Sequence, residues 1–257
     1  CDLKGLQDCA FKLASFNSHF KGEFLSSLGQ FLGKPELTNL ELQLNEMKKL
    51  DSKFLMNFAN QISHAQTLRS IKLEFYDLPL TESGLGVLIE EIAKISYLNK
   101  FSFDIYNRGT PSNTIYETIT KKFQTLKSIE ELELKFFNAK VITNTCLMGL
   151  AKSLEQIQKL NKLSLIFGYT DGYSEEGIIR LAIAISELKL LKRVKLEFSL
   201  SEFTFYYFSR AIPYLQRLED LHIRWTKEYN SDAIIPEDTI IMLFRSFAYL
   251  TKLISLK

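Results

Sequence analysis

Apolar residues recur along this chain in a block that is repeated nine times. Within a block, an apolar residue is followed by others three, five and usually seven positions later, and the block restarts after about 31 residues. The blocks start at Leu6, Leu37, Leu68, Leu98, Ile129, Leu160, Leu191, Leu218 and Leu253. A nearly constant period of this length predicts a solenoid, in which each repeat packs only against its neighbours.

The unit that starts at Leu160 illustrates the elements expected in each repeat. Residues 163–167 carry apolar side chains at every second position, which is typical of a strand with one buried face. Residues 168–176 are rich in turn formers. The apolar stripe of an amphipathic helix follows at Ile178, Leu181, Ile185 and Leu188. Each repeat thus has an apolar strand face and an apolar helix stripe that only stacking can bury.

The alternation of strand and helix determines how the strands are arranged. Strands joined through a helix run parallel, with right-handed crossovers. Because parallel strands lie ~4.8 Å apart and packed helices ~8–10 Å apart, the helices form the convex side and the strands line the concave side. We predict a right-handed α/β solenoid. Its expected strands are Cys9–Leu13, Leu40–Leu44, Ile71–Phe75, Phe101–Ile105, Leu132–Phe136, Leu163–Phe167, Val194–Phe198 and Leu221–Trp225.

Two blocks carry the short motif of a known family. Leu160–Leu165 reads Leu-Asn-Lys-Leu-Ser-Leu, and Leu218–Ile223 reads Leu-Glu-Asp-Leu-His-Ile, which match the LxxLxL opening of leucine-rich repeats. The chain resembles leucine-rich-repeat proteins over nearly its whole length, and its long period resembles the ribonuclease-inhibitor-like subclass. The resemblance implies a horseshoe with a parallel sheet on its concave face. The family's Asn or Cys, eight positions after the first Leu, occurs here only as Asn45, so irregular turns are expected after the other strands.

The repeats extend from near the first residue to the last. We therefore expect residues 1–257 to form one domain of about eight full repeats and the start of a ninth. The first residue is Cys1 rather than Met, which suggests a part of a longer chain. Neither end has an evident polar cap. We expect the apolar residues of both ends, such as Phe11 and Leu256, to be covered by further residues or by a partner in an assembly.

Composition and charge exclude several classes of function. The 32 basic and 30 acidic residues give a net charge of +2, and no basic block indicates a nucleic-acid partner or an anionic membrane surface. No apolar run approaches the ~18 residues that predict a transmembrane helix. The three cysteines lack metal-ligand spacing, and no glycosylation sequon occurs. We expect an intracellular, cytoplasmic location without membrane insertion.

The outward residues of the predicted strands have two interpretations. In the first, opposite charges on adjacent strands neutralise each other and keep the sheet soluble. The expected pairs are Glu41 with Lys72, Asp104 with Lys135, Glu131 with Lys162, and Glu197 with Arg224. In the second, the face binds a protein, and an acidic segment would bind at its less balanced C-terminal part. The candidate binding residues there are Lys162, Arg193, Lys195, His222 and Arg224.

The enlarged strand-to-helix loop of residues 226–238 is a second candidate interface. Insertions in solenoids concentrate on the functional edge. Tyr229, Ile234 and Ile235 are candidate contacts in this loop, although the two isoleucines can equally fold back on the edge.

Residues 203–208 are unusually aromatic and form a third candidate. Phe205 and Tyr206 either belong to an exposed patch that binds a partner or fill the space of a deleted turn. Phe208 occupies a helical core position, and Trp225 occupies a core position of its strand.

Groups suited to catalysis are few and dispersed. The histidines lie in different repeats without partners four residues away, at His19, His64 and His222, so no metal site is expected. No His is placed to activate Cys9 or Cys146. We expect neither enzyme activity nor a cofactor.

The sequence therefore predicts a non-catalytic protein–protein interaction scaffold within a larger assembly. The alternative is a regulatory or substrate-recognition module of an enzyme on the same polypeptide, such as a kinase or a ubiquitin-ligase receptor. A GTPase activator of the horseshoe type would need a loop arginine, for which Arg108 is the candidate.

Overall fold

The described strands form one parallel sheet. The structure is a computed structural model that describes residues 7–14, 31–32, 36–46, 52–106, 113–137, 142–168, 174–199, 202–226 and 235–257. Within these residues, nine strands pair in the order of the sequence, and all eight neighbouring pairs are parallel. They are β1 (Asp8–Ala14), β2 (Asn39–Asn45), β3 (Ser70–Tyr76), β4 (Lys100–Tyr106), β5 (Glu131–Phe137), β6 (Lys162–Phe167), β7 (Arg193–Ser199), β8 (Asp220–Thr226) and β9 (Ser255–Leu256).

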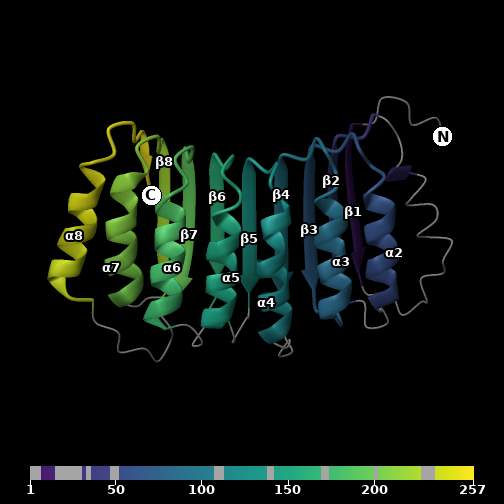
Figure 1. The fold of residues 1–257 in the computed structure, drawn as a ribbon, viewed down its shortest axis with the longest axis horizontal. Coiled ribbons are helices and arrows are strands. Elements are labelled where there is room, and N and C mark those ends of the chain that lie inside the picture. The colour runs from purple at the N-terminus through teal and green to yellow at the C-terminus, as the bar shows by residue number, and fades with distance from the viewer. Residues whose placement is uncertain are drawn as a thin grey trace.

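The described helices pack side by side on one face of this sheet (Figure 1). They are α2 (Ser52–Ile62), α3 (Glu82–Ile92), α4 (Asn113–Lys122), α5 (Asn144–Leu154), α6 (Glu175–Ser186), α7 (Glu202–Ala211) and α8 (Glu237–Phe247). Short 3₁₀ turns, η1 (Phe123–Thr125) and η2 (Ile212–Tyr214), extend α4 and α7. The predicted right-handed leucine-rich-repeat solenoid is confirmed, with the sheet on the concave face and the helices on the convex face.

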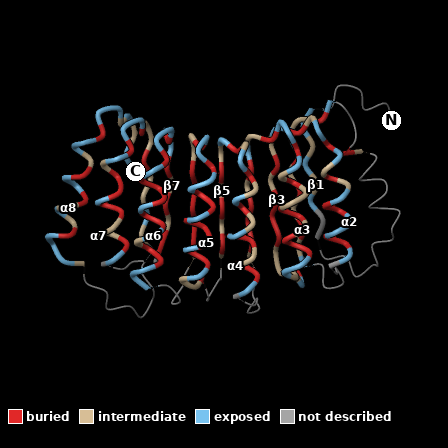
Figure 2. Tube along the Cα trace, in the orientation of Figure 1, coloured by how far each residue is buried: buried red, intermediate tan, exposed pale blue. Residues whose placement is uncertain are grey.

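All eight expected strands are present, and most extend one residue further at each end. The pairing is residue for residue, so the inward side chain of one strand lies beside its counterpart on the next. These inward side chains and the facing helix residues form one buried cluster. Figure 2 marks buried positions on both the strands and the helices. Aromatic rings follow each other through it: the ring centroids of Phe136 and Phe167 are 5.6 Å apart, and those of Phe167 and Phe198 are 5.2 Å apart.

The turns after β2 and β3 are formed by backbone groups. Glu46 and Asp77 follow these strands with positive φ angles of 51°. Their N–H groups donate to the carbonyls of Tyr76 and Tyr106, each at 2.8 Å. The side-chain oxygen of Asn45, where the family's polar residue was expected, is buried without a hydrogen-bond partner. The turn geometry thus does not depend on that oxygen.

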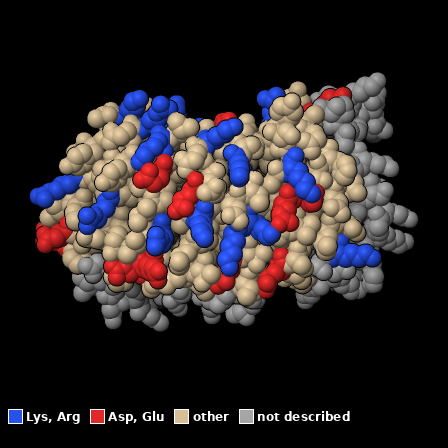
Figure 3. Space-filling model, in the orientation of Figure 1, with Lys and Arg blue, Asp and Glu red and all other residues tan. Residues whose placement is uncertain are grey.

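The outer surfaces of the solenoid carry charged side chains on the convex face and uncovered apolar side chains at the β9 end. On the convex face, basic and acidic side chains are interspersed, so neither sign dominates (Figure 3). At the β9 end, apolar side chains are uncovered, and Phe244 and Ile254 are 64% and 84% exposed. None of the described helices has the length and apolar run that a membrane crossing requires.

Among the described carboxylates of the concave face, that of Asp104 on β4 is the most deeply buried. Asp104 is only 4% exposed, and its Oδ1 has no hydrogen-bond partner. The Nζ of Lys135 is 4.0 Å from Oδ2. Burial raises the pKa of Asp104 to about 6; the charge of Lys135 opposes this shift, whereas the charges of Glu74 and Glu133 add to it. The folded state therefore disfavours the ionised carboxylate.

Replacing Asp104 by Asn should change how stability depends on pH. The unfolded carboxyl has a pKa of about 3.9, so the folded chain binds more protons between about pH 4 and pH 6, and this group lowers stability as the pH rises through that range. Asn cannot ionise, and Lys135 keeps Glu133 at 2.9 Å as a partner. We expect Asp104→Asn to raise the free energy of unfolding by about 1–3 kcal/mol at pH 8, with little effect at pH 4.

Urea denaturation between pH 4 and pH 8 measures this difference. The control is Glu130→Gln, because Glu130 is exposed. An Asp104→Asn protein that is less stable than the parent at pH 8 would contradict the account of a penalised buried carboxylate.

Helices α5 and α6 approach each other closely at Gly177. A Cβ at this position would lie 2.7 Å from the Oδ1 of Asn144 and 3.0 Å from the Cδ1 of Leu147. That same Oδ1 accepts a hydrogen bond of 2.8 Å from the backbone N–H of Ser174, immediately before α6. The absence of a side chain at Gly177 therefore preserves a contact between two consecutive repeats.

Two glycine substitutions should have opposite effects on stability. Gly177→Ala displaces Asn144 and should lower the free energy of unfolding by about 1–3 kcal/mol. At Gly86 in α3, the nearest atom to an added Cβ is the Cγ2 of Thr118 at 3.6 Å, an ordinary contact. Gly86→Ala should raise stability by about 0.5–1 kcal/mol, because Ala favours the helix. Urea denaturation measures the free energy of unfolding of both variants. Equal changes in the two would contradict the close approach of Gly177 to Asn144.

Candidate functional site

The outward residues of β5 to β9 form two rows across the concave face. The strand register places Lys162 beside Arg193, and Arg193 beside Asp220. Two residues further along each strand, Ser164 lies between Glu133 and Lys195, and Lys195 lies beside His222. Residues of repeats about 31 positions apart thus meet on one surface.

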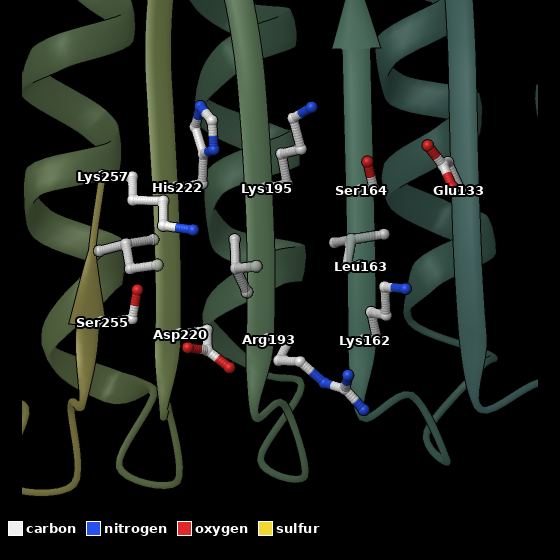
Figure 4. A pocket seen from close by; sticks show the side chains of 12 residues that line it. Glu133, Lys162, Leu163, Ser164, Arg193, Lys195, Asp220, His222, Ser255 and Lys257 are labelled. Carbon is white, nitrogen blue, oxygen red and sulfur yellow. The ribbon is translucent and has the colours of Figure 1, made fainter.

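A hollow of about 400 Å³ opens between these rows (Figure 4). We call it the basic hollow. Its polar lining comprises Glu133, Lys162, Ser164, Arg193, Lys195, Asp220, His222, Ser255 and Lys257. Ser164 is 3% exposed, because longer side chains flank this short one. The hollow therefore results from a small residue set among large ones on an otherwise continuous sheet.

The lining of the basic hollow has an excess of positive charge. Four Lys or Arg side chains stand against the two carboxylates of Glu133 and Asp220, and His222 adds a fifth basic group when protonated. Because these basic residues come from β6, β7, β8 and the position directly after β9, they surround the hollow rather than line one side of it. Such an arrangement attracts negatively charged groups.

Only part of this positive charge is neutralised by neighbours. Lys162 lies 3.5 Å from Glu131, and Lys195 lies 3.0 Å from Glu197. Within the described residues, Arg193 has no carboxylate within 4 Å, and neither has His222. The side chain of Arg193 extends towards β6, on the side of Lys162 (Figure 4).

The positive charge near the basic hollow affects the pKa of Glu131 on β5. Partial burial acts to raise its pKa, but the hydrogen bond from Lys100 and the charges of Lys100, Lys162 and Arg193 outweigh burial. The pKa of Glu131 is therefore lower than usual. This carboxylate stays ionised and partly screens one side of the basic hollow.

The N-terminal half of the concave face is more evenly balanced. Lys72 binds Glu41 at 2.9 Å and Glu74 at 2.7 Å, and Lys100 binds Glu131 at 3.1 Å. Three of the four cross-strand pairs expected from the sequence are confirmed, including Asp104 with Lys135. The fourth is wrong: Glu197 pairs with Lys195, which lies two residues away on the same strand and face, and Arg224 remains exposed.

The structure brings together four of the five basic candidates. Lys162, Arg193, Lys195 and His222 line the basic hollow, whereas Arg224 lies one row further along β8 and does not. The sequence did not single out Ser164 or Lys257. The sequence feature that could have indicated Ser164 is its small size: it is a short polar residue at the outward position whose counterparts on the adjacent strands are Glu133 and Lys195.

The aromatic candidates have separate environments. Phe205 is half-buried and stacks on Trp225 with a centroid distance of 3.8 Å, so the exposed patch expected there is not formed by Phe205. Trp225 itself is only half-buried, because β9 pairs with Asp220 and Leu221 and does not cover the rest of β8. Tyr206 accepts a hydrogen bond of 2.8 Å from Arg210 on the same helix.

The candidates in the enlarged loop are mostly not described. Tyr229 and Ile234 lie outside the described residues, as does Arg108. Ile235 is half-buried and stands immediately before Pro236, which precedes α8.

The described residues contain no group of three or more His, Cys, Asp or Glu side chains that could hold a metal ion. Cys146 is buried in α5, and burial raises the pKa of its thiol to about 12. Cys9 is half-buried, and burial raises its pKa as well. Both thiols are therefore poor nucleophiles at neutral pH.

Comparisons with known proteins concern the fold alone. No protein-family model matches the sequence, and no curated protein matches it. Among solved structures, an internalin from Listeria monocytogenes is 12% identical, with a TM-score of 0.28 and coverage of 87% of this chain and 81% of that one. A leucine-rich-repeat protein of Leptospira interrogans is 13% identical, with a TM-score of 0.28 and coverage of 89% and 73%.

A third structure, TLR13 in complex with ssRNA13, is 16% identical, with a TM-score of 0.32. The match covers 87% of this chain and 36% of that one. Similarity at this level carries no argument about ligands or partners. The chain is a leucine-rich-repeat solenoid by its own strand order, register and repeat.

Proposed function

We propose that this chain is a non-catalytic protein-interaction module of a larger assembly, and that the basic hollow binds an acidic segment of a partner protein. The observation that supports this most directly is the excess of two positive charges around a concave site. Arg193 is central to it, because this guanidinium has no carboxylate within 4 Å among the described residues. The long repeat, with helices of 10 to 12 residues between strands, supports placement in the ribonuclease-inhibitor-like subclass.

The physical character of the site supports a charged rather than an apolar partner. The side chains that project into the basic hollow are predominantly basic, and the apolar residues Leu163, Val194 and Leu221 are buried beneath them. Electrostatic complementarity of this kind mainly determines specificity and the rate of association. Binding should therefore weaken as the salt concentration rises, since the Debye length is about 10 Å at 0.1 M and about 3 Å at 1 M.

Reversing the charge of Arg193 should weaken binding of an acidic peptide. The probe is a fluorescein-labelled peptide of alternating Asp and Glu, and the measurement is fluorescence anisotropy at 0.05 M and 0.3 M salt. We expect Arg193→Glu to raise Kd at least about tenfold, or about 1.4 kcal/mol, at the lower salt concentration.

The matched control is Lys12→Glu. Lys12 is an exposed outward residue of β1, at the opposite end of the same sheet, and its reversal changes the net charge equally. Its Kd should stay within about twofold of the parent value at 0.3 M salt, where longer-range effects are screened. Equal losses in both variants would show that the peptide senses only the net charge, and the proposed site would be wrong.

A further inference from the structure

Ser164 has an unusual position on the floor of the basic hollow. Its side chain is 3% exposed, and its Oγ has no hydrogen-bond partner. A buried hydroxyl without a partner is unfavourable compared with one that is hydrogen-bonded. The geometry therefore leaves a free donor at the bottom of a site that is lined with cations.

The side chains around Ser164 could surround a compact anion. Lys195 is its direct neighbour on β7, and Lys162 precedes it by two residues on β6. Arg193 stands beside Lys162 and extends towards β6 (Figure 4). These three side chains offer hydrogen-bond donors from two strands and from different directions. The hydroxyl of Ser164 lies between them, closer to the backbone of the sheet.

Ser102 on β4 provides an internal comparison. It occupies the same outward position two strands away, beside Glu133, and its Oγ is also buried without a partner. Its other neighbour, Lys72, is held by two glutamates at 2.9 and 2.7 Å. The hollow at Ser102 is smaller, about 160 Å³. The two serines thus differ mainly in the space around them and in Arg193, which lies near Ser164 and has no carboxylate within 4 Å among the described residues.

The number and directions of the donors favour a phosphoryl group over a carboxylate. A phosphorylated side chain has about −1.5 to −2 charges at neutral pH and three strong acceptor oxygens, and it pairs well with Arg. This charge matches the two excess positive charges of the lining. A carboxylate has one charge and two oxygens, and would leave part of the donor set unused.

We propose that the basic hollow recognises a phosphoserine side chain in the acidic segment of the partner. Ser164 donates its hydroxyl to one phosphoryl oxygen, and Lys162, Arg193 and Lys195 bind the others. This proposal rests on the proposed function and names the group that the same site selects. Phosphorylation of the partner then controls its association with this chain.

Glu133 opposes an anion at this site and thereby provides a second test. It lies beside Ser164 and is bound to Lys135 at 2.9 Å, which neutralises its charge only in part. Glu133→Gln keeps the shape of the side chain and removes its charge. It should strengthen binding of a phosphorylated peptide more than binding of the same peptide without phosphate.

The experiment uses three fluorescein-labelled peptides of the sequence Gly-Asp-Glu-X-Asp-Glu-Gly, in which X is phosphoserine, serine or glutamate. Fluorescence anisotropy at 0.15 M salt gives Kd for the parent chain and for Ser164→Ala, Ser102→Ala and Glu133→Gln. We expect the phosphoserine peptide to bind about tenfold more tightly than the serine peptide, or about 1.4 kcal/mol, and more tightly than the glutamate peptide. Ser164→Ala should reduce this preference at least about threefold, and Ser102→Ala should leave it unchanged.

Stability separates a role in binding from a structural role. Because the Oγ of Ser164 has no partner, Ser164→Ala should melt at the same temperature as the parent or higher, while its phosphopeptide affinity falls. A variant that melts lower and binds all three peptides equally weakly has lost structure, and that outcome would contradict the assignment of an unpartnered hydroxyl.

The remaining outcomes distinguish this proposal from the function on which it rests. If the three peptides bind equally and Arg193→Glu weakens all of them, the acidic-segment site stands and phosphoserine recognition is wrong. If the phosphopeptide is preferred but neither Ser164→Ala nor Glu133→Gln changes that preference, the phosphate does not bind at Ser164. If none of the peptides binds, both proposals are wrong.

Discussion

Residue-for-residue pairing of parallel strands is the constraint on which the rest of this structure depends. A single repeat has an apolar strand face and an apolar helix stripe, and neither can be buried without the next repeat. Pairing in register brings equivalent positions to ~4.8 Å from each other, so Phe136 meets Phe167 and Phe167 meets Phe198. The same stacking brings α5 against α6, where a Cβ at position 177 would lie 2.7 Å from the Oδ1 of Asn144.

The register that builds the core also determines the chemistry of the concave face. Outward residues of successive repeats become direct neighbours. Opposite charges at equivalent positions, such as those of Glu41 and Lys72, therefore neutralise each other. Where the repeats supply Lys162, Arg193 and Lys195 with too few carboxylates, positive charge accumulates. A short side chain at Ser164 then leaves a hollow in that charged surface. The candidate site is thus formed by residues from several consecutive repeats rather than by any single motif.

Several side-chain oxygen atoms of the face are buried without a hydrogen-bond partner, and they differ in what surrounds them. Asp104 has Lys135 nearby and an elevated pKa of about 6, because burial outweighs that attraction. The hydroxyl of Ser102 lies beside a lysine that two glutamates already engage. Among the described residues of this face, Ser164 combines an unpartnered hydroxyl with a large hollow and with Arg193, which has no carboxylate within 4 Å. The conjunction of these three properties distinguishes the basic hollow from the rest of the sheet.

The sequence by itself determined the repeat, the position of every long strand, the parallel order and the side on which the helices pack, because these depend on the period and on which side chains are apolar. It also indicated four basic residues of the basic hollow, since the period alone shows which strand residues point outwards and which of them are neighbours. It could not determine that Glu197 pairs with Lys195 rather than Arg224, that Phe205 stacks on Trp225, or that Ser164 is buried. Those outcomes depend on side-chain length, rotamer and the neighbours across adjacent strands, which only the tertiary structure decides.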